Sequence, residues 1–497
     1  MPISHCSSLA SLALRLIAII ALTLLPAAGR ATAAPDGSPT AAEWQGIRRL
    51  MQRDVLLAPP VISVWQPEGQ LNAPDAAGDN GLHFGYDVAI DGSTLVVGAY
   101  VDSSPLVDAG SVYVFEKPAA GWGAVTQYAK LTASDAAASD LFGKSVAIDG
   151  STIVVGAPYD DTATITNHGA VYVFVKPGAQ WVSMTQTAKL TASDKTGQDR
   201  LGWDVGISGG TVAVGAPYHD GNAKDEQGAV YVFERPSGGW AAWTGSMAES
   251  AELYGYEGTP GDHLGTAVAI SGETIIAGAP DHNLGGQINP DSGVAYIFRK
   301  DGGWTSGTEH ARLAPSDSAE LDYFGLSVAI DGNVAVVGSP GDPSPQNAAN
   351  TSAVYVYRRP PGDWAAPDPY TENARLTASD GVYSDNFGRA VDISGSIIVV
   401  GANFDKVNTQ DKQGSAYVYI EPAGGWANHT ENARLLAGDG VTLDEFGFSV
   451  SISGLTIAAG APRNSVQPSG YHLGSTYLFK GIDWSDSIYL PLLTKGS

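Results

Sequence analysis

Apolar residues recur along this chain in short runs of strand type. From position 145 the side chains alternate between polar and apolar up to Asp149-Gly150, and a β-branched run, 153–155, follows directly. An Asp-Gly pair flanked by β-branched residues is a strong signal of a two-residue hairpin. A third apolar run covers 170–174 and a fourth about 181–190. The pattern therefore predicts four antiparallel strands in this segment.

The four-strand pattern repeats seven times at intervals of 58 to 63 residues. Each copy begins with an aromatic residue or Leu followed by Gly, and a second Gly stands thirteen residues after the first. A repeat of this size cannot bury its own apolar face, so the copies must pack on one another. We predict an all-β fold, a seven-bladed β-propeller with four antiparallel strands per blade. An open β-solenoid is the alternative, but its coils are usually shorter and need no hairpin in each unit.

Closure of the ring needs a strand from one of the chain ends. After 476–479 the last copy lacks its regular fourth strand, and an unpaired blade would expose a sheet edge. Residues 61–71 resemble a degraded copy of the segment that ends the other blades, so we predict that they supply the outer strand of blade seven. Trp484 and the run 488–493 are the competing candidates.

The two ends also indicate the compartment. Residues 9–28 hold an apolar run, and Ala31-Thr32-Ala33 after it looks like a signal peptidase site. We expect a secreted, extracellular or cell-surface protein, with membrane attachment only if this segment is retained. The tail is either a closing strand or a sorting signal. The predicted divisions are a signal peptide at 1–34, a linker with a short helix at 35–60, the propeller at 61–482 and a C-terminal tail at 483–497.

Charge and motif content exclude several classes of function. The chain has 52 acidic and 27 basic residues and a formal net charge of -25, which repels nucleic acid and attracts divalent cations. Its one cysteine, Cys6, lies in the segment expected to be removed. Gly143-Lys144-Ser145 imitates the end of a phosphate loop but lacks the first Gly. Because the sequence has no catalytic motif, we expect a protein that is not an enzyme. Its acidic charge argues against nucleic-acid binding, and we expect a monomer.

The order Phe-Gly, hairpin, Gly-Ala-Pro resembles the FG-GAP repeat of the integrin α-subunit N-terminal β-propeller and its secreted bacterial relatives. The resemblance implies adhesion and ligand binding, and in some members calcium in a D-x-D-x-D-G loop inside the first hairpin. Here tight turns close that hairpin and leave no room for a calcium cage, so the loop is not carried over. The literal Gly-Ala-Pro begins at Gly156, Gly215, Gly278 and Gly460.

A second acidic pattern recurs between the outer strand of one copy and the inner strand of the next. We interpret the first Asp of each pair as a cap for backbone N–H groups in a tight loop. The alternative is a weak Ca²⁺ site, the one cofactor that the sequence suggests. The pairs are Asp135 and Asp140, Asp194 and Asp199, Asp317 and Asp322, Asp380 and Asp385, and Asp439 and Asp444.

The loops after Gly-Ala-Pro vary in sequence and length. If the chain alternates up and down through each blade, these loops share one face with the acidic loops, and loops on a rigid scaffold are where binding residues concentrate. Six of their residues, from three consecutive copies, are candidates for a ligand or His/Asp metal site near the central channel; scattered solvated residues are the alternative. They are Asp160, Asp161, His219, Asp220, Asp281 and His282.

The sequence thus predicts a protein-binding or adhesion module whose variable face contacts a protein or glycan ligand at the cell surface. An extracellular enzyme acting on glycans or other polymers, with acidic loop residues near the channel, is one alternative. A structural spacer of the cell surface is another. Each copy but the last also has one Trp, which we interpret as cover between blades rather than a sugar-stacking surface. These residues are Trp122, Trp181, Trp240, Trp304, Trp364 and Trp426.

Overall fold

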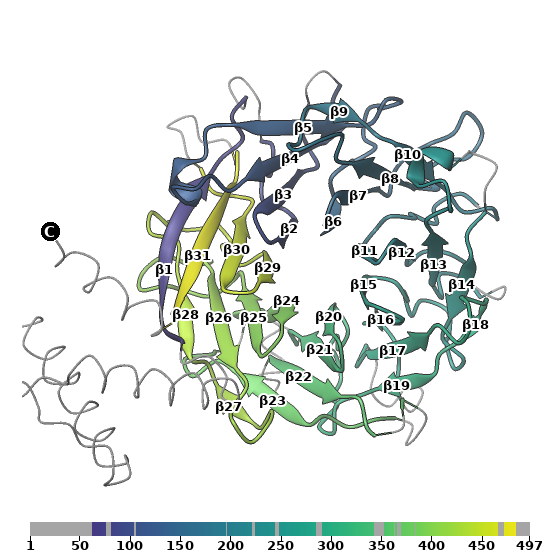
Figure 1. Ribbon diagram of the computed structural model, residues 1–497. Helices are drawn as coiled ribbons and strands as arrows, with labels where there is room; N and C mark the ends of the chain where they lie inside the picture. Colours follow the sequence, from purple (N-terminus) through teal and green to yellow (C-terminus); the bar gives the residue numbers. More distant parts are fainter. Residues whose placement is uncertain are drawn as a thin grey trace, which may run out of the picture. The chain divides into compact units, whose positions relative to one another are not determined.

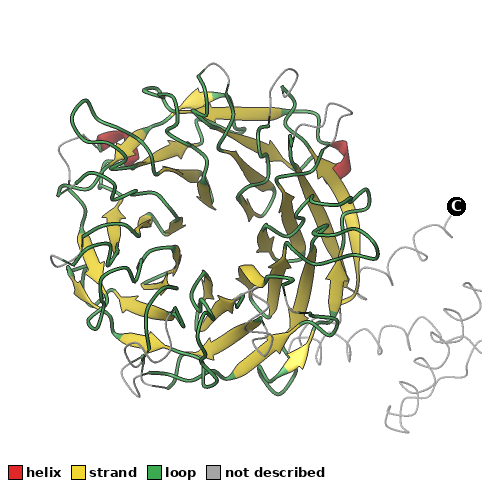
Figure 2. Ribbon diagram, turned by 180° about the vertical axis from the view of Figure 1, so that it is seen from behind, coloured by secondary structure: helices red, strands yellow, loops and turns green. Residues whose placement is uncertain are grey.

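Seven β-sheets form a closed ring in the computed structural model (Figure 1). The view from behind shows the same ring, with two short 3₁₀ helices at its rim, Trp122–Ala124 and Trp240–Ala242 (Figure 2). The predicted seven-bladed, all-β propeller is therefore confirmed. In the described part of the chain, no helix is long and apolar enough to cross a bilayer. The structure describes residues 62–483 except 76–80, 104–105, 195, 221–223, 244–247, 285–290, 342–351, 362, 365–368, 383 and 466–471.

Each blade runs from its inner strand at the ring axis to its outer strand at the rim. The first blade consists of β2 (Val88–Asp91), β3 (Thr94–Ala99), β4 (Ser111–Glu116) and β5 (Tyr128–Thr132). The second to fourth blades are β6 (Ser145–Asp149), β7 (Thr152–Ala157), β8 (Ala170–Val175) and β10 (Ala188–Leu190); β11 (Val205–Ser208), β12 (Thr211–Ala216), β13 (Ala229–Glu234) and β14 (Ala251–Tyr254); and β15 (Ala267–Ser271), β16 (Thr274–Ala279), β17 (Val294–Arg299) and β19 (Ala311–Leu313). The fifth to seventh are β20 (Ser327–Asp331), β21 (Val334–Ser339), β22 (Ala353–Arg358) and β23 (Ala374–Thr377); β24 (Phe387–Ser394), β25 (Ile397–Ala402), β26 (Ser415–Ile420) and β28 (Ala433–Leu435); and β29 (Ser449–Ser453), β30 (Thr456–Ala461), β31 (Ser475–Asp483) and β1 (Ile62–Leu71).

The fourth strand of the second blade differs from the expected run of 181–190. Only β10 pairs within that blade, whereas the short strand β9 (Met184–Thr185) pairs in parallel with β5 of the preceding blade. The strands β18 (Gly307–Thr308) and β27 (His429–Thr430) extend the third and fifth blades in the same way. These short additions cover the outer edge of alternate blades.

The ring closes through the N-terminal strand. β1 pairs antiparallel with β31 along its whole length, so the seventh blade takes its outer strand from the start of the described chain. Of the two candidates from the sequence, this is the segment 61–71. Trp484 and 488–493 lie outside the described residues, as do the expected signal peptide and linker.

The two glycines of each repeat mark the contact between neighbouring blades. A Cβ atom added to Gly156 would lie 2.0 Å from the carbonyl oxygen of Gly202 in the next blade, and one on Gly460 would lie 1.9 Å from that of Gly85. Only glycine permits two backbones to approach so closely. The constant spacing of these glycines therefore keeps every blade in the same register against its neighbour.

Apolar seams between blades form the core. The second and third strands of each blade are buried on both faces, which explains their unbroken apolar sequence. One seam joins Val154 and Val171 of the second blade to Val212 and Tyr231 of the third. The repeated Trp side chains are buried, from Trp122 at 0% exposed to Trp426 at 7%. They therefore serve the packing of the blades, as the sequence interpretation had it.

The connections divide between two faces. The loops after the second strand meet the loops that enter each blade, as where Gln198 N donates to Thr166 O at 3.0 Å; we call this side the loop face. The turns after the first strand meet one another on the opposite side, the turn face, where Gly150 N donates to Asp91 Oδ2 at 2.7 Å. Strands that alternate in direction, as expected from the sequence, thus place the loops after the second strand and the loops that enter each blade on the same face.

Candidate functional site

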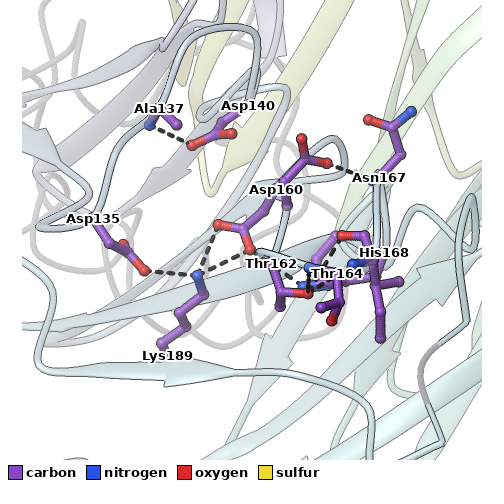
Figure 3. Close-up of polar contacts among 12 residues, drawn as sticks. Asp135, Ala137, Asp140, Asp160, Thr162, Thr164, Asn167, His168 and Lys189 are labelled. Carbon is purple, nitrogen blue, oxygen red and sulfur yellow. Dashed lines mark hydrogen bonds and ion pairs between the residues drawn. The ribbon is translucent and has the colours of Figure 1, made fainter.

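Each blade carries a group of polar side chains at the loop face, which we call its polar cluster. In the second blade it consists of Asp135 from the entering loop, Asp160 from the loop after β7, Tyr172 of β8 and Lys189 of β10. Lys189 Nζ lies 2.7 Å from Asp135 Oδ2 and 2.8 Å from Asp160 Oδ2 (Figure 3). The Tyr172 hydroxyl lies 2.6 Å from Asp160 Oδ2 and 3.1 Å from Asp135 Oδ1. An ammonium group thus occupies the space between two carboxylates.

The charges of this cluster stabilise one another. Burial alone would lower the pKa of Lys189, but its hydrogen bonds to Asp135 and Asp160 outweigh burial and raise it. Burial opposes ionisation of Asp135, yet the hydrogen bond from Lys189 brings the pKa of that carboxyl below its ordinary value. Burial, followed by the charge of Asp160, raises the pKa of Tyr172, which therefore stays protonated. The cluster is a satisfied ion-pair network.

The same arrangement recurs around the ring with different donors. The fourth-strand residue lies opposite the third-strand Tyr and contacts the first acid of the entering loop. In the first blade Lys130 Nζ lies 2.8 Å from both Asp75 Oδ2 and Asp102 Oδ2. The other blades with such a donor pair Arg312 with Glu257, Arg375 with Asp317, Arg434 with Asp380 and Asp405, and Gln70 with Asp439.

The third blade reverses these charges. His219 stands where the second blade has Asp160, and Glu252 of β14 stands where it has Lys189. His219 Nε2 lies 3.1 Å from Glu252 Oε1 and 3.9 Å from Asp194 Oδ2, and its Nδ1 lies 3.4 Å from Asp199 Oδ1. Burial alone would lower the pKa of His219, but hydrogen bonds with Asp199 and Glu252 raise it to about 10.

The two members of each Asp pair have different partners. Our interpretation gave the backbone cap to the first Asp, but the structure shows the second Asp in this role: Asp140 accepts the Ala137 N–H at 2.7 Å (Figure 3). The first Asp bonds to the third-strand Tyr and the fourth-strand donor. Calcium binding by the pairs stays a prediction, and it would have to displace a Lys or Arg side chain at three of the five pairs. The second Asp caps its loop in the same way at Asp199, Asp322, Asp385 and Asp444.

The six candidate residues after Gly-Ala-Pro do not gather at the ring axis. Asp160 and His219 belong to the polar clusters of separate blades, and His282 Nδ1 lies 2.8 Å from Asp262 Oδ2. The central channel, about 550 Å³ in volume, is lined by residues of the inner strands, and none of the six is among its described lining residues. The reason is directional, because side chains such as Asp160 point towards the outer strand.

The other three candidates bond locally. Asp161 accepts the Asn167 N–H at 2.6 Å, and Asp220 accepts the Glu226 N–H at 3.0 Å, so each closes its own loop. Asp281 Oδ2 lies 2.6 Å from His263 Nδ1. Burial alone would lower the pKa of His263, but its hydrogen bond with Asp281 raises it. These contacts order the loops; a role in ligand binding stays a prediction.

A surface that the sequence analysis missed surrounds the channel at the loop face. The residue after the Gly of each Phe-Gly pair lines the channel, and five of these residues are aromatic or basic; we call them the channel-mouth ring. Lys144 Nζ lies 3.6 Å from the ring centroid of Trp203, and the Arg389 guanidinium lies 4.4 Å from that of Phe448. The phenyl ring of Phe448 in turn lies 4.8 Å from the ring of Tyr86. The channel-mouth ring thus consists of Tyr86, Lys144, Trp203, Arg389 and Phe448, all partly exposed.

Further cation–aromatic contacts extend the channel-mouth ring outwards. The Arg200 guanidinium lies 3.9 Å from the ring centroid of Tyr218 and 5.0 Å from that of Tyr159. Both Tyr residues follow Gly-Ala-Pro directly, one position before the candidates that the sequence singled out. The residue type at the channel-mouth position differs from blade to blade, so the repeat shows no common residue there. The only signal in the sequence was the constant place of this position, directly after Phe-Gly.

Three comparisons relate this chain to known proteins, and the match to a family model agrees with the architecture. A search of curated proteins finds no match. A solved structure, the WD40 domain of coronin from Toxoplasma gondii, is 10% identical, covers 85% of this chain and 88% of its own, and has a TM-score of 0.48. The family model for the FG-GAP repeat matches residues 65–115, 125–174, 184–233, 247–298, 308–357, 370–419 and 429–479. FG-GAP propellers are typically protein-binding modules and generally non-catalytic. Because the matched ranges cover more than half of the sequence, the chain belongs to the FG-GAP repeat family.

Proposed function

We propose that this protein is a secreted or cell-surface binding module that holds a protein partner over the channel mouth of its loop face. The observation that carries the proposal is the channel-mouth ring, with Arg200, Tyr159 and Tyr218 beside it. Tyr, Trp and Arg dominate the residues that contribute most to binding energy at protein interfaces. A partly exposed group of these residues, carried on a rigid ring, is a suitable anchor for a partner.

The charge of this surface favours an acidic partner segment. The chain as a whole carries a net charge of -25, yet Lys144, Arg200 and Arg389 all lie around the channel mouth. Three carboxylates also line the channel, those of Asp87, Asp204 and Asp392, but each accepts two backbone N–H groups of the inner strands. The cationic groups at the mouth can therefore direct acidic groups to this place on an otherwise acidic surface. Because Lys144 already covers one face of Trp203, the indole is less suited to stacking on a sugar than to packing against protein side chains.

The turn face offers no comparable surface among its described residues. Its Asp side chains accept N–H groups from the neighbouring turns, with Asp149 Oδ2 2.6 Å from Gly209 N and Asp331 Oδ2 2.6 Å from Gly395 N. These carboxylates are exposed and would repel an acidic segment. The two faces of the ring therefore differ in chemistry, and the loop face is the one suited to binding.

Export is the second part of the proposal. The apolar run at 9–28, the small residues after it and the absence of cysteine beyond Cys6 support it. We propose adhesion at the cell surface as its role, because a secreted ring with one binding face can attach to a surface protein. A direct check is the N-terminal residue of the protein recovered from the medium, which we expect near position 35.

A cross-linking experiment tests the binding face. A photoreactive benzoylphenylalanine at Leu326, on the channel, is compared with one at Ser151, on the turn face, after incubation with surface proteins of the producing cells. We expect a discrete product from position 326 alone. Lys144→Glu should abolish the product, whereas the charge-matched Lys406→Glu, in a loop away from the channel lining, should not. Equal products from both positions, or a product insensitive to Lys144→Glu, would refute the proposed face.

A further inference from the structure

We propose that the polar cluster of the third blade binds a divalent transition-metal ion of the Zn²⁺ class through Asp194, His219 and Glu252. The ligand atoms of the three side chains lie within 4.8 Å of one another. Zinc binds nitrogen and oxygen ligands at about 2.0–2.2 Å, so two ligands of one tetrahedral ion stand roughly 3.4 Å apart. The separations of 3.1 and 3.9 Å from His219 Nε2 to the two carboxylates bracket that value.

The remaining contacts of His219 direct its Nε2 towards the proposed ion. Asp199 Oδ1 lies 3.4 Å from Nδ1, and the hydroxyl oxygen of Tyr231, whose proton is donated to Asp194 Oδ1, lies 3.3 Å from the same nitrogen. Asp199 is itself held by the backbone N–H and the hydroxyl of Thr196, both at 2.6 Å. A carboxylate at one imidazole nitrogen fixes the tautomer that presents the other nitrogen to a metal. The ligand imidazole is therefore oriented by a side chain that is anchored independently of it.

The other blades show what this cluster lacks. Across from the third-strand Tyr, the fourth strands supply Lys, Arg or Gln to the cluster, and among these seven described positions only Glu252 is acidic. In the second blade Lys189 Nζ sits between two carboxylates. The third blade keeps the acid of the entering loop and adds another, so an external cation can take the position of the missing ammonium group.

A protonated His219 is the competing cation. With one proton on the imidazole, the third cluster would have the same formal charge as the second, when Asp199 is counted in the third cluster and Asp140 in the second. A metal ion has to displace that proton, as metal binding to an imidazole generally does. The donor set favours zinc over calcium, because one imidazole with two carboxylates matches the mixed nitrogen and oxygen coordination of zinc sites and not the all-oxygen sites of calcium. The side chain of Asp194 is 42% exposed, which gives an ion a path from solvent.

The fourth blade is a natural control within the same molecule. His282 Nδ1 lies 2.8 Å from Asp262 Oδ2, as His219 faces Asp199, but Arg312 takes the fourth-strand position and pairs with Glu257. A guanidinium group there repels a metal ion. We therefore expect one bound ion per chain, in the third blade, although both blades have the same His.

Titration with Co²⁺ tests the site, because tetrahedral cobalt with nitrogen and oxygen ligands absorbs visible light. The purified full chain should bind one equivalent with a visible band, and Zn²⁺ should displace it. Glu252→Lys, which restores the cation of the second blade, should weaken Co²⁺ binding by more than about 10-fold, at least the effect of losing a group that only supports a ligand. The charge-matched control is Glu273→Lys on the turn face, which should leave binding unchanged.

Two results would overturn the proposal. The first is the absence of a saturable visible band in the unmodified protein, which needs no variant and leaves His219 as a protonated partner of Glu252. The second is equal binding by the Glu252→Lys and Glu273→Lys variants, which would reduce the uptake to the acidic surface in general. The far-ultraviolet circular dichroism of both variants, if unchanged, confirms that the ring is intact in the comparison.

Discussion

The close approach of glycines between blades predicts a large effect of a single methyl group. In Gly278→Ala the new Cβ would lie 1.8 Å from the carbonyl oxygen of Gly325 and 2.7 Å from its carbonyl carbon. The φ angle of Gly278 lies outside the left-handed region, so alanine suits the backbone and the cost is steric alone. Both atoms that clash with the methyl group belong to backbone, which cannot turn aside as a side chain can.

The magnitude follows from how far the fourth and fifth blades must separate. An ordinary contact of this kind is about 3.4 Å, so the methyl group would overlap the carbonyl oxygen by more than about 1 Å and force the two blades apart. A gap of about 0.5–1 Å between packed atoms already loses roughly a quarter to a half of their dispersion energy. The seam here contains Ile276, Phe324 and Val337. Overpacking typically costs about 1–3 kcal/mol, and with rigid backbone on both sides we expect about 3 kcal/mol or more.

Two other glycines separate the possible causes. Gly272 has φ +57° and nothing within 4 Å of an added Cβ, so Gly272→Ala reports left-handed strain alone, about 1–2 kcal/mol. Gly303 has neither a positive φ nor a neighbour within 4 Å, and Gly303→Ala should be close to neutral. Urea unfolding followed by tryptophan fluorescence gives the shift in midpoint for each variant. If Gly278→Ala unfolds at the same urea concentration as Gly303→Ala, the glycine contact does not hold the blades in register.

Two further variants test the ion-pair network and the closure of the ring. Lys189→Met should cost about 1–2 kcal/mol at pH 7, a figure reduced from that of a fully buried pair because Lys189 is 26% exposed. Because the pKa of Asp135 is lowered in the folded protein, its carboxylate contributes stability above the ordinary pKa of 3.8, and this contribution is lost as the pH falls through the folded value. The loss in free energy of unfolding caused by Lys189→Met should therefore be smaller at pH 3 than at pH 7, as measured by urea unfolding. The same loss at both pH values would contradict this. Deletion of 62–71 should leave β31 with an open edge and produce oligomers in size-exclusion chromatography, whereas a monomer of unchanged thermal stability would show that β1 is dispensable.

The architecture followed from the sequence because its signals are local and repeated. The Asp-Gly hairpin, the constant glycine spacing and the seven copies each point to the same ring, and the family match confirms it. The division of the fourth strand did not follow, because Met184-Thr185 pairs across to the preceding blade and two residues carry no periodic pattern. Local pattern cannot tell which neighbour a two-residue strand joins.

The candidate site was predicted only to the level of its face. The variable loops were placed together correctly, but the direction of a side chain such as Asp160 depends on the pairing of Lys189 with Tyr172 across two strands, which sequence spacing does not give. The sequence did contain a signal of this pairing, because most repeats that have an acid in the entering loop also have a basic residue on the fourth strand. The exchange at His219 and Glu252 then stands out as a joint departure from the repeat.

The closure through β1 has a consequence for how the chain is delivered. Gln70 and Tyr477, whose side chains are 3.2 Å apart in the closed ring, are 407 positions apart in sequence. A chain that is synthesised or exported from its N-terminus presents this first strand long before its partner exists. The strand must therefore wait, unpaired, until β31 has also been made, and its open edge can pair with other chains during that interval.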